Sequence, residues 1–172
     1  MWIETSTGNR IAKDAAISGP DNIVISGNCT IHPGASLHGD VTLLTPSTGP
    51  TILIGKYSHL NSNCQIIPPV LQDDKHGPVA IGAYCIVGHD TVVRLATIGN
   101  RVIIEDGCDL QNLSIIYDCC VIRKGTVVPP KMVIPPFSEV LGVPGTDFKV
   151  GELSNAYKKL IETEAKELQL QT

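Results

Sequence analysis

The sequence predicts an all-β solenoid, a parallel β-helix of six-residue units that is closed by one C-terminal α-helix. Three observations predict it. An aliphatic residue recurs at every sixth position over long blocks, a small residue lies two positions before most of these aliphatics, and the pattern becomes helical after residue 150. Hexapeptide repeats are typical of the parallel β-helix, in which equivalent positions of successive coils stack about 4.8 Å apart.

The six-residue period is unbroken in the second half of the chain. The aliphatic positions there are Ile98, Ile104, Leu110, Ile116, Ile122, Val128, Ile134 and Val140. Earlier blocks have the same spacing, at Ile25, Ile31, Leu37, Leu43, Ile54, Leu60, Ile66, Ile81, Val87 and Val93. A helix does not explain the spacing, because six is not a multiple of 3.6 and the apolar face would drift around the helix. Each unit is therefore expected to be a short strand followed by a turn.

A small or compact side chain lies two residues before most of these aliphatics. These positions are Cys29, Ala35, Val41, Ser58, Cys64, Cys85, Thr91, Val102, Cys108, Ser114, Cys120 and Thr126. A separation of two residues places both side chains on the same face of a strand, so both are expected to point inward. Cysteine acts there as a small apolar residue, and no CxxC spacing indicates a zinc site. Only Cys119 is expected to point the other way.

Glycine follows the inward aliphatic at Gly55, Gly82, Gly88 and Gly99. These glycines are expected at the corners of the coil, where the backbone needs a positive φ or a close approach to its neighbour.

The β-helix is expected to cover residues 1–150, with an N-terminal cap and two loops ejected from its corners at residues 45–51 and 67–78. The second loop is the most polar excursion of the body, and it carries Asp73, Asp74, Lys75 and His76. Two interpretations account for these four residues, a solvated loop and a contact surface for a partner.

Residues 151–172 are expected to form an amphipathic helix that packs on the β-helix, with Ser154 as its N-cap. The apolar stripe of that helix consists of Leu153, Tyr157, Leu160, Ile161, Glu164 and Leu168. A helix that binds a partner protein is the alternative.

Composition and charge exclude several function classes. Hydrophobic residues make up 42% of the chain but aromatic residues only 4%, which disfavours an aromatic binding groove. A net charge of -4 provides no long-range attraction for nucleic acid or for an anionic membrane. No apolar run approaches membrane-spanning length, so we expect an intracellular protein without direct membrane insertion.

The histidines raise the possibility of an enzyme. Residues 81–100 resemble the metal-site segment of the gamma-class carbonic anhydrases, trimeric β-helix enzymes that hold zinc with histidines between subunits. His89 matches the first histidine of the H-x-x-x-x-H pair in that family, but Arg94 stands at the second position and cannot ligate zinc. Residues 133–145 resemble the closing coil of the hexapeptide acyltransferases, for which His89 is the one tolerable base. We therefore expect no metal and no cofactor, with a homotrimeric enzyme of either kind as the alternative.

The segments outside the repeat resemble one family in particular. Residues 3–11 and 18–25, and the close from Val133 to Leu153, are similar to the dynactin subunit 5 family. The resemblance implies a non-catalytic, left-handed β-helix in the pointed-end complex of dynactin, located in the cytoplasm and associated with microtubules through dynactin and dynein.

The implied partners are dynactin subunit 6, the pointed-end actin-related protein, the sixty-two-kilodalton subunit and dynein cargo adaptors, and the implied role is to couple dynein to cargo such as endosomes. We expect the contact surface to be the outer β-helix face together with Asp73, Asp74, Lys75 and His76.

Overall fold

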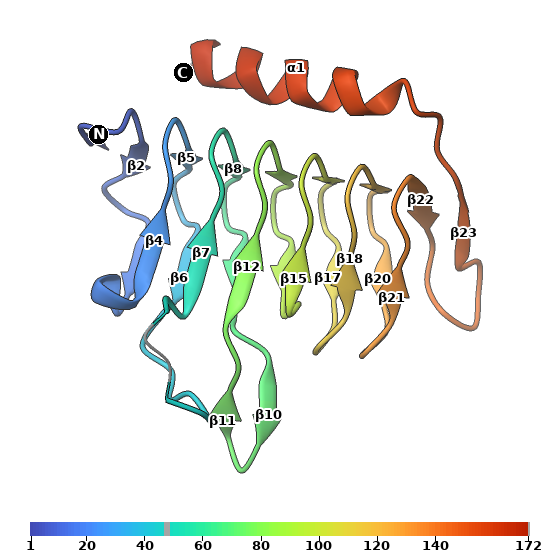
Figure 1. Cartoon of the computed structure of the whole chain (residues 1–172), viewed down its shortest axis with the longest axis horizontal. Helices are drawn as coiled ribbons and strands as arrows, with labels where there is room; N and C mark the ends of the chain where they lie inside the picture. The colour runs from blue at the N-terminus through green and yellow to red at the C-terminus, as the bar shows by residue number, and fades with distance from the viewer. Residues whose placement is uncertain (47–48, 172) are drawn as a thin grey trace.

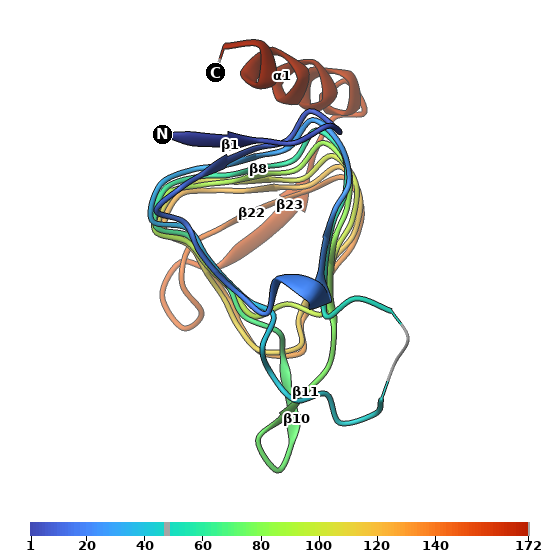
Figure 2. The same ribbon diagram turned by 90° about the vertical axis from the view of Figure 1, so that its left-hand side faces the viewer.

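The computed structural model describes residues 1–46 and 49–171, except for the side chain of residue 171. The chain winds into a three-sided parallel β-helix, and one α-helix runs along one of the three sides (Figures 1 and 2). This architecture confirms the fold class predicted from the six-residue period.

Each side of the β-helix is one sheet. Sheet A consists of β1 (Trp2–Glu4), β2 (Arg10–Ala12), β5 (Thr30–Ile31), β8 (His59–Leu60), β13 (Ile86–Val87), β16 (Ile103–Ile104), β19 (Val121–Ile122), β22 (Ser138–Leu141) and β23 (Lys149–Glu152). Sheet B consists of β3 (Ala16–Ser18), β6 (Ser36–His38), β9 (Gln65–Ile66), β14 (Val92–Val93), β17 (Asp109–Leu110) and β20 (Val127–Val128). Sheet C consists of β4 (Ile23–Ile25), β7 (Ile52–Ile54), β12 (Val79–Ile81), β15 (Thr97–Ile98), β18 (Ile115–Ile116) and β21 (Val133–Ile134), with the short 3₁₀-helix η1 (Pro20–Asn22) before β4.

The coils stack in parallel register, and antiparallel pairs occur at the two ends of sheet A. Ile98 pairs with Ile81 on one side and with Ile116 on the other, and Ile116 pairs in turn with Ile134. At the ends, β1 pairs with β2 and β22 pairs with β23 in antiparallel fashion. The repeating aliphatic residues thereby form continuous ladders inside the prism, and nearly all of them belong to one buried cluster.

Leu43 is an exception, and its predicted place in the core is wrong. Leu43 and Val41 are only half-buried, and Leu43 forms an isolated parallel bridge with His76 outside the prism. The coil that begins with β5 and β6 is completed by β7 (Ile52–Ile54), which pairs with β4 of the preceding coil. The chain therefore leaves the coil directly after β6, earlier than the predicted start at residue 45; residues 47 and 48 of that excursion lie outside the described residues.

The second excursion is a β-hairpin rather than an irregular loop. Strands β10 (Val70–Gln72) and β11 (Lys75–His76) pair in antiparallel fashion, and the turn between them is Asp73-Asp74. Both aspartates have positive φ, 52° and 59°, which is the geometry of a two-residue type I′ turn. Aspartate tolerates this region better than most residues. Both excursions leave the corner between sheets B and C (Figure 2).

The small inward positions have a second requirement that the sequence pattern did not show. At some of these positions the side chain donates to a corner carbonyl of the next coil: Cys85 Sγ lies 3.0 Å from Gly99 O, and Ser58 Oγ lies 2.8 Å from Gly82 O. Cysteine, serine and threonine all suit this role because each is small and carries a donor. All six cysteines are free and buried. Burial raises the pKa of Cys85 to about 12, so its thiol stays protonated at neutral pH.

The corner glycines are needed for close approach and not for positive φ. Gly82 has an ordinary φ, but a Cβ at this position would lie 2.5 Å from the carbonyl oxygen of Gly99 on the next coil. A side chain would force these stacked corners apart.

The helix α1 (Tyr157–Gln171) lies along the outer surface of sheet A (Figure 1). Ile161 packs with Val121 and Leu153, and Ala165 packs with Tyr84 and Ile86. Two polar contacts also hold α1 on sheet A. Arg101 Nε lies 3.0 Å from Glu162 Oε2, and the His59 ring Nε2 lies 2.9 Å from the carbonyl oxygen of Ala165.

The packed stripe of α1 is narrower than predicted. Leu160 is 59% exposed, and Glu164 is exposed as well. Ser154 lies before the helix, where its hydroxyl accepts a hydrogen bond from the N–H of Ala156. The division of the chain into two parts at residue 150 stays a prediction. The helix itself begins at Tyr157 and not at residue 151, because β23 runs from Lys149 to Glu152 and belongs to sheet A. Within the described part of the chain, no helix is long and apolar enough to span a bilayer.

His59 makes the stability of the fold sensitive to pH. Burial lowers the pKa of His59 from its ordinary 6.5, the Ala165 carbonyl raises it less, and His32 lowers it further. Burial also lowers the pKa of His32. The unfolded chain therefore binds these protons at higher pH than the folded chain, so the free energy of unfolding falls as the pH drops below 6.5.

We expect the melting temperature to fall between about pH 7 and pH 5, and to fall less in His59→Gln, which keeps an N–H donor but does not titrate. Thermal melts across this range check the prediction. Equal slopes for the two proteins would contradict it.

Candidate partner-binding face

Sheet C carries a ladder of outward apolar side chains. The outward residues in register along the sheet are Val24, Leu53, Ala80, Thr97, Ile115 and Val133. Five of the six are apolar, and Val24, Leu53 and Val133 are 46%, 37% and 52% exposed. Whereas α1 covers sheet A, no α-helix among the described residues lies on sheet C (Figure 2).

Sheet B shows that the apolar ladder is not a consequence of the repeat itself. The equivalent outward residues of sheet B are Ala16, Ser36, Gln65, Val92, Asp109 and Val127. Half of these are polar or charged, as expected for a solvated face. Contiguous exposed apolar surface is typical of protein interaction sites, so sheet C is the better candidate.

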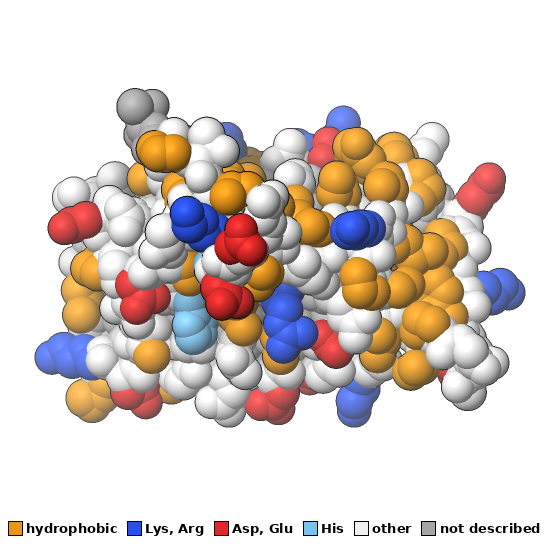
Figure 3. Space-filling model, turned by 90° about the horizontal axis from the view of Figure 1, so that it is seen from below, with side chains coloured by type: hydrophobic (Ala, Val, Ile, Leu, Met, Phe, Trp, Pro, Cys, Tyr) orange, Lys and Arg blue, Asp and Glu red, His pale blue; other side chains and the backbone are white. Residues whose placement is uncertain are grey.

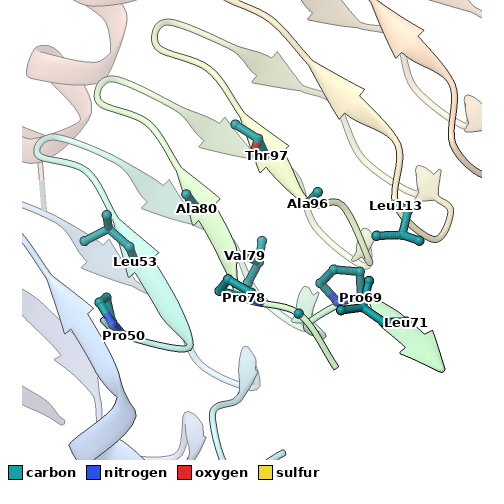
Figure 4. A pocket seen from close by; sticks show the side chains of 11 residues that line it. Pro50, Leu53, Pro69, Leu71, Pro78, Val79, Ala80, Ala96, Thr97 and Leu113 are labelled. Carbon is teal, nitrogen blue, oxygen red and sulfur yellow. The ribbon is translucent and has the colours of Figure 1, made fainter. Parts of the chain in front are cut away.

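A groove of about 440 Å³ crosses this face beside the hairpin (Figure 4). Its floor consists of the small residues Ala80, Ala96 and Thr97. Pro50 and Leu53 form one wall, and the opposite wall is formed by Pro69, Leu71 and Leu113. The groove exists because the small residues Ala80 and Thr97 stand in the ladder between the larger Leu53 and Ile115. It suits an apolar side chain better than a charged one, since its walls are prolines and leucines.

The hairpin that borders the groove is held in place on both sides. The side-chain amide of Asn112 accepts from the N–H of Val70 and donates to its carbonyl oxygen, each at 2.8 Å. His76 Nδ1 lies 2.8 Å from the carbonyl oxygen of Pro68, and the backbone of His76 bonds to Thr42 and Leu44. The hairpin is therefore a fixed wall of the groove.

The predicted contact residues lie at this hairpin but differ in accessibility. Asp73, Asp74 and Lys75 are exposed at the tip. His76 is half-buried, and its ring bonds to Pro68, so it has a structural part in the hairpin. Charged and hydrophobic side chains share the lower side of the molecule, where hydrophobic ones gather toward the C-terminal coils (Figure 3). Contact of these four residues with a partner stays a prediction.

The sequence reasoning missed the apolar ladder of sheet C, although a signal was present. An apolar doublet such as Ile115-Ile116 or Val133-Ile134 places one residue inward and its neighbour outward. These two doublets are 18 residues apart, which is three six-residue units. Doublets that recur once per coil therefore indicate one apolar outer face.

The residues at the zinc position of the gamma-class carbonic anhydrases do not fit a metal. His89 is exposed, and Arg94 Nη1 lies 3.6 Å from Asp109 Oδ1. The neighbours of Arg94 on the adjacent coils are Ile67 and Gln111, neither of which is a good zinc ligand. The described residues contain no group of three or more His, Cys, Asp or Glu side chains that could hold a metal ion.

The family follows from a comparison over nearly the whole chain. The sequence model of the family described as dynactin subunit 5 matches residues 1–169. The chain belongs to the dynactin subunit 5 family. Its similarity to dynactin subunit 5 of Dictyostelium discoideum is 33% identity over 104 residues, or 58% of this chain and 48% of that protein. The match thus spans about half the length of that relative.

Other similarities of this dynactin subunit 5 family member concern the fold. A probable carbonic anhydrase of Methanocaldococcus jannaschii is 30% identical over 136 residues, which covers 79% of this chain and 76% of that protein. A hexapeptide transferase family protein of Anaplasma phagocytophilum superposes with a TM-score of 0.68 at 17% identity, covering 95% of this chain and 90% of that one. A UDP-N-acetylglucosamine acyltransferase of Bacteroides fragilis gives 0.60 at 18% identity, covering 90% and 69%. The fold is thus the left-handed β-helix of hexapeptide-repeat proteins.

Proposed function

We propose that this chain is a non-catalytic structural subunit of the dynactin pointed-end complex and that sheet C is its main contact face. The observation that carries the proposal is the apolar ladder of sheet C, together with the family match over residues 1–169. A largely apolar outer face is costly to leave in water, and a permanent partner removes that cost.

The partners in this proposal are the companion β-helix subunit (dynactin subunit 6), the pointed-end actin-related protein and the sixty-two-kilodalton subunit. Through them the chain helps dynein to engage adaptors and cargo such as endosomes in the cytoplasm. Asp73, Asp74 and Lys75 add a polar border to the apolar groove, because the hairpin tip projects beside it. A polar rim around an apolar centre is the usual anatomy of a protein interface.

The alternative is a homotrimeric enzyme, and the similarity to a probable carbonic anhydrase favours it. Arg94 argues against that chemistry, since its guanidinium stands at the position of the second histidine and pairs with Asp109. The cysteines do not replace the missing ligand, because burial raises the pKa of Cys108 to about 11.

Affinity purification of the tagged full chain from its source cells tests the proposal. We expect the companion β-helix subunit and the pointed-end actin-related protein in the eluate of the wild-type chain. Leu53→Asp/Val133→Asp adds two charges to sheet C and is expected to reduce their recovery about tenfold or more, since each 1.4 kcal/mol lost at an interface is tenfold in affinity.

The matched control is Ala16→Asp/Val127→Asp, which adds the same two charges to outward positions of sheet B. This control is expected to recover both partners and to melt like the wild type. Absence of the two partners from the wild-type eluate, or a homotrimer with stoichiometric zinc, would overturn the proposed function. Normal recovery with the sheet C variant would overturn the assignment of the face.

A further inference from the structure

A second surface hollow lies beside α1, on the side of sheet A that the helix leaves open. The helix packs over the outward row of Ile86, Ile103 and Val121. The next row, which includes Asn61, Gly88 and Glu105, lies at the edge of this covered strip. Two adjoining hollows, of about 800 and 380 Å³, share Ile103 and Glu164. We call this surface the α1 trough.

The centre of the α1 trough is apolar. Ile103 lies in both hollows, and Ile86 and Leu160 flank it. Leu160 is 59% exposed although its neighbour Ile161 is almost fully buried. The Leu160 side chain does not take part in the packing of α1 on sheet A. It lines the trough instead, next to Ile103.

The walls of the α1 trough are mainly acidic. Glu164 and Glu167 stand on the helix side, and Glu105 and Asp106 stand on the solenoid side. Glu105 Oε2 lies 3.4 Å from Arg123 Nη1, so this carboxylate is paired. Glu164 and Glu167 have no ion-pair partner among the described residues. The cations that line the trough are Lys124 and Lys159, so carboxylates outnumber ammonium groups there.

The other flank of α1 has a different electrostatic character. There Lys166 and Arg101 surround Glu162, and both cations also lie over the ring of Tyr84. The acidic flank is therefore the one that faces the open trough. An apolar centre between acidic walls is complementary to a segment with one aliphatic stripe and basic residues on both sides.

We propose that the α1 trough binds a basic amphipathic helix of a partner protein, which lies beside α1 and extends the helical layer over sheet A. Its aliphatic side chains contact Ile103 and Leu160, and its lysines or arginines lie toward Glu164, Glu167 and Asp106. A helix fits because sheet A already accepts one along the coil axis, and neighbouring helices pack about 8–10 Å apart. An extended strand would need a free sheet edge, and the trough lies on a sheet face. An anionic membrane surface is repelled by the same carboxylates.

A labelled synthetic peptide and the full-length chain test this inference. The probe is a helix of about 18 residues with leucine and alanine at i, i+3, i+4 and i+7 and lysine elsewhere, and its counterpart has glutamate in place of every lysine. We expect fluorescence anisotropy to show saturable binding of the lysine peptide, at least about tenfold tighter than the glutamate peptide. Glu164→Lys/Glu167→Lys is expected to reverse this preference. Leu160→Ser is expected to weaken the binding of both peptides.

The control variant is Asp14→Lys/Asp21→Lys, which changes the net charge equally at exposed positions outside the trough. It is expected to bind the lysine peptide like the wild type. If this control lost as much affinity for the lysine peptide as Glu164→Lys/Glu167→Lys, the binding would be non-specific charge attraction, and the proposal would be overturned. Unchanged binding by Glu164→Lys/Glu167→Lys, with a normal melting temperature, would overturn it as well. Sheet C has no part in this test, so its outcome is independent of the proposed function.

Discussion

Ile116→Asp is expected to leave the chain insoluble. Ile116 is fully buried and stacks between Ile98 and Ile134 on the inward side of sheet C, so an aspartate there lies in the hydrophobic core. An unpaired carboxylate in such a site costs several kcal/mol, which is comparable to the ~5–15 kcal/mol that holds a typical domain folded. Because each coil is stabilised by its neighbours, the defect spreads to the coils on both sides.

Ile115→Asp is the matched control for this substitution. Ile115 is the preceding residue of the same strand and points outward. We expect it to stay soluble and to melt within a few degrees of the wild type. Solubility after expression and the melting temperature check the pair. Soluble, normally melting Ile116→Asp would refute the inward assignment of the ladder.

Ile161→Asp is expected to detach α1 from sheet A. Ile161 is 1% exposed and packs against Val121 and Leu153, so the substitution removes the central apolar contact of the helix and buries a charge. We expect a loss of at least about 3 kcal/mol in helix docking. Sheet A then exposes Ile86, Ile103 and Val121, and α1 becomes accessible to proteases.

Leu160→Asp provides the comparison, because Leu160 is adjacent in sequence but 59% exposed. This variant is expected to keep the wild-type protease resistance of α1 and its melting temperature. Limited proteolysis followed by mass spectrometry locates the first cleavage sites. Early cleavage between residues 153 and 171 in Leu160→Asp as well would contradict the assignment of Leu160 to the exposed face, and protease resistance of Ile161→Asp would contradict the assignment of Ile161 to the buried face.

The inward ladders could be predicted from the sequence because a buried stack leaves little choice of residue. Every coil places an aliphatic side chain such as Ile98 or Ile116 over the one before it, and the chain must return to that point after a fixed number of residues. The same reasoning identified the small positions, including Cys85. It did not reveal that Cys85 and Ser58 donate to the next coil, since that role depends on the carbonyls that stacking brings near.

Leu43 shows that the six-residue spacing alone does not decide whether an aliphatic residue lies in the core. It continues the six-residue period, yet it leaves the prism and pairs with His76 of an excursion that comes much later in the chain. The sequence cannot separate these two places for a leucine, because the leucine removes apolar surface from water in either of them. The same holds for Leu160, since a 3.6-residue period predicts an apolar stripe but not which edge of the stripe meets the sheet.

The family could also be recognised from sequence segments outside the repeat, and the comparison confirmed it. The candidate face could not be located in this way, because its residues come from six coils and two excursions interrupt the count between them. Val24 and Val133 share a face only once the coils are in register.

By itself, then, the sequence determined the β-helix, its inward ladders and the C-terminal helix, because burial imposes a period that can be read along the chain. The tertiary structure alone decided which side of the prism α1 covers and that sheet C is left apolar and open. These features depend on side chains of distant coils that become neighbours only after folding, such as Ala165 on Tyr84 and Leu53 beside Ala80.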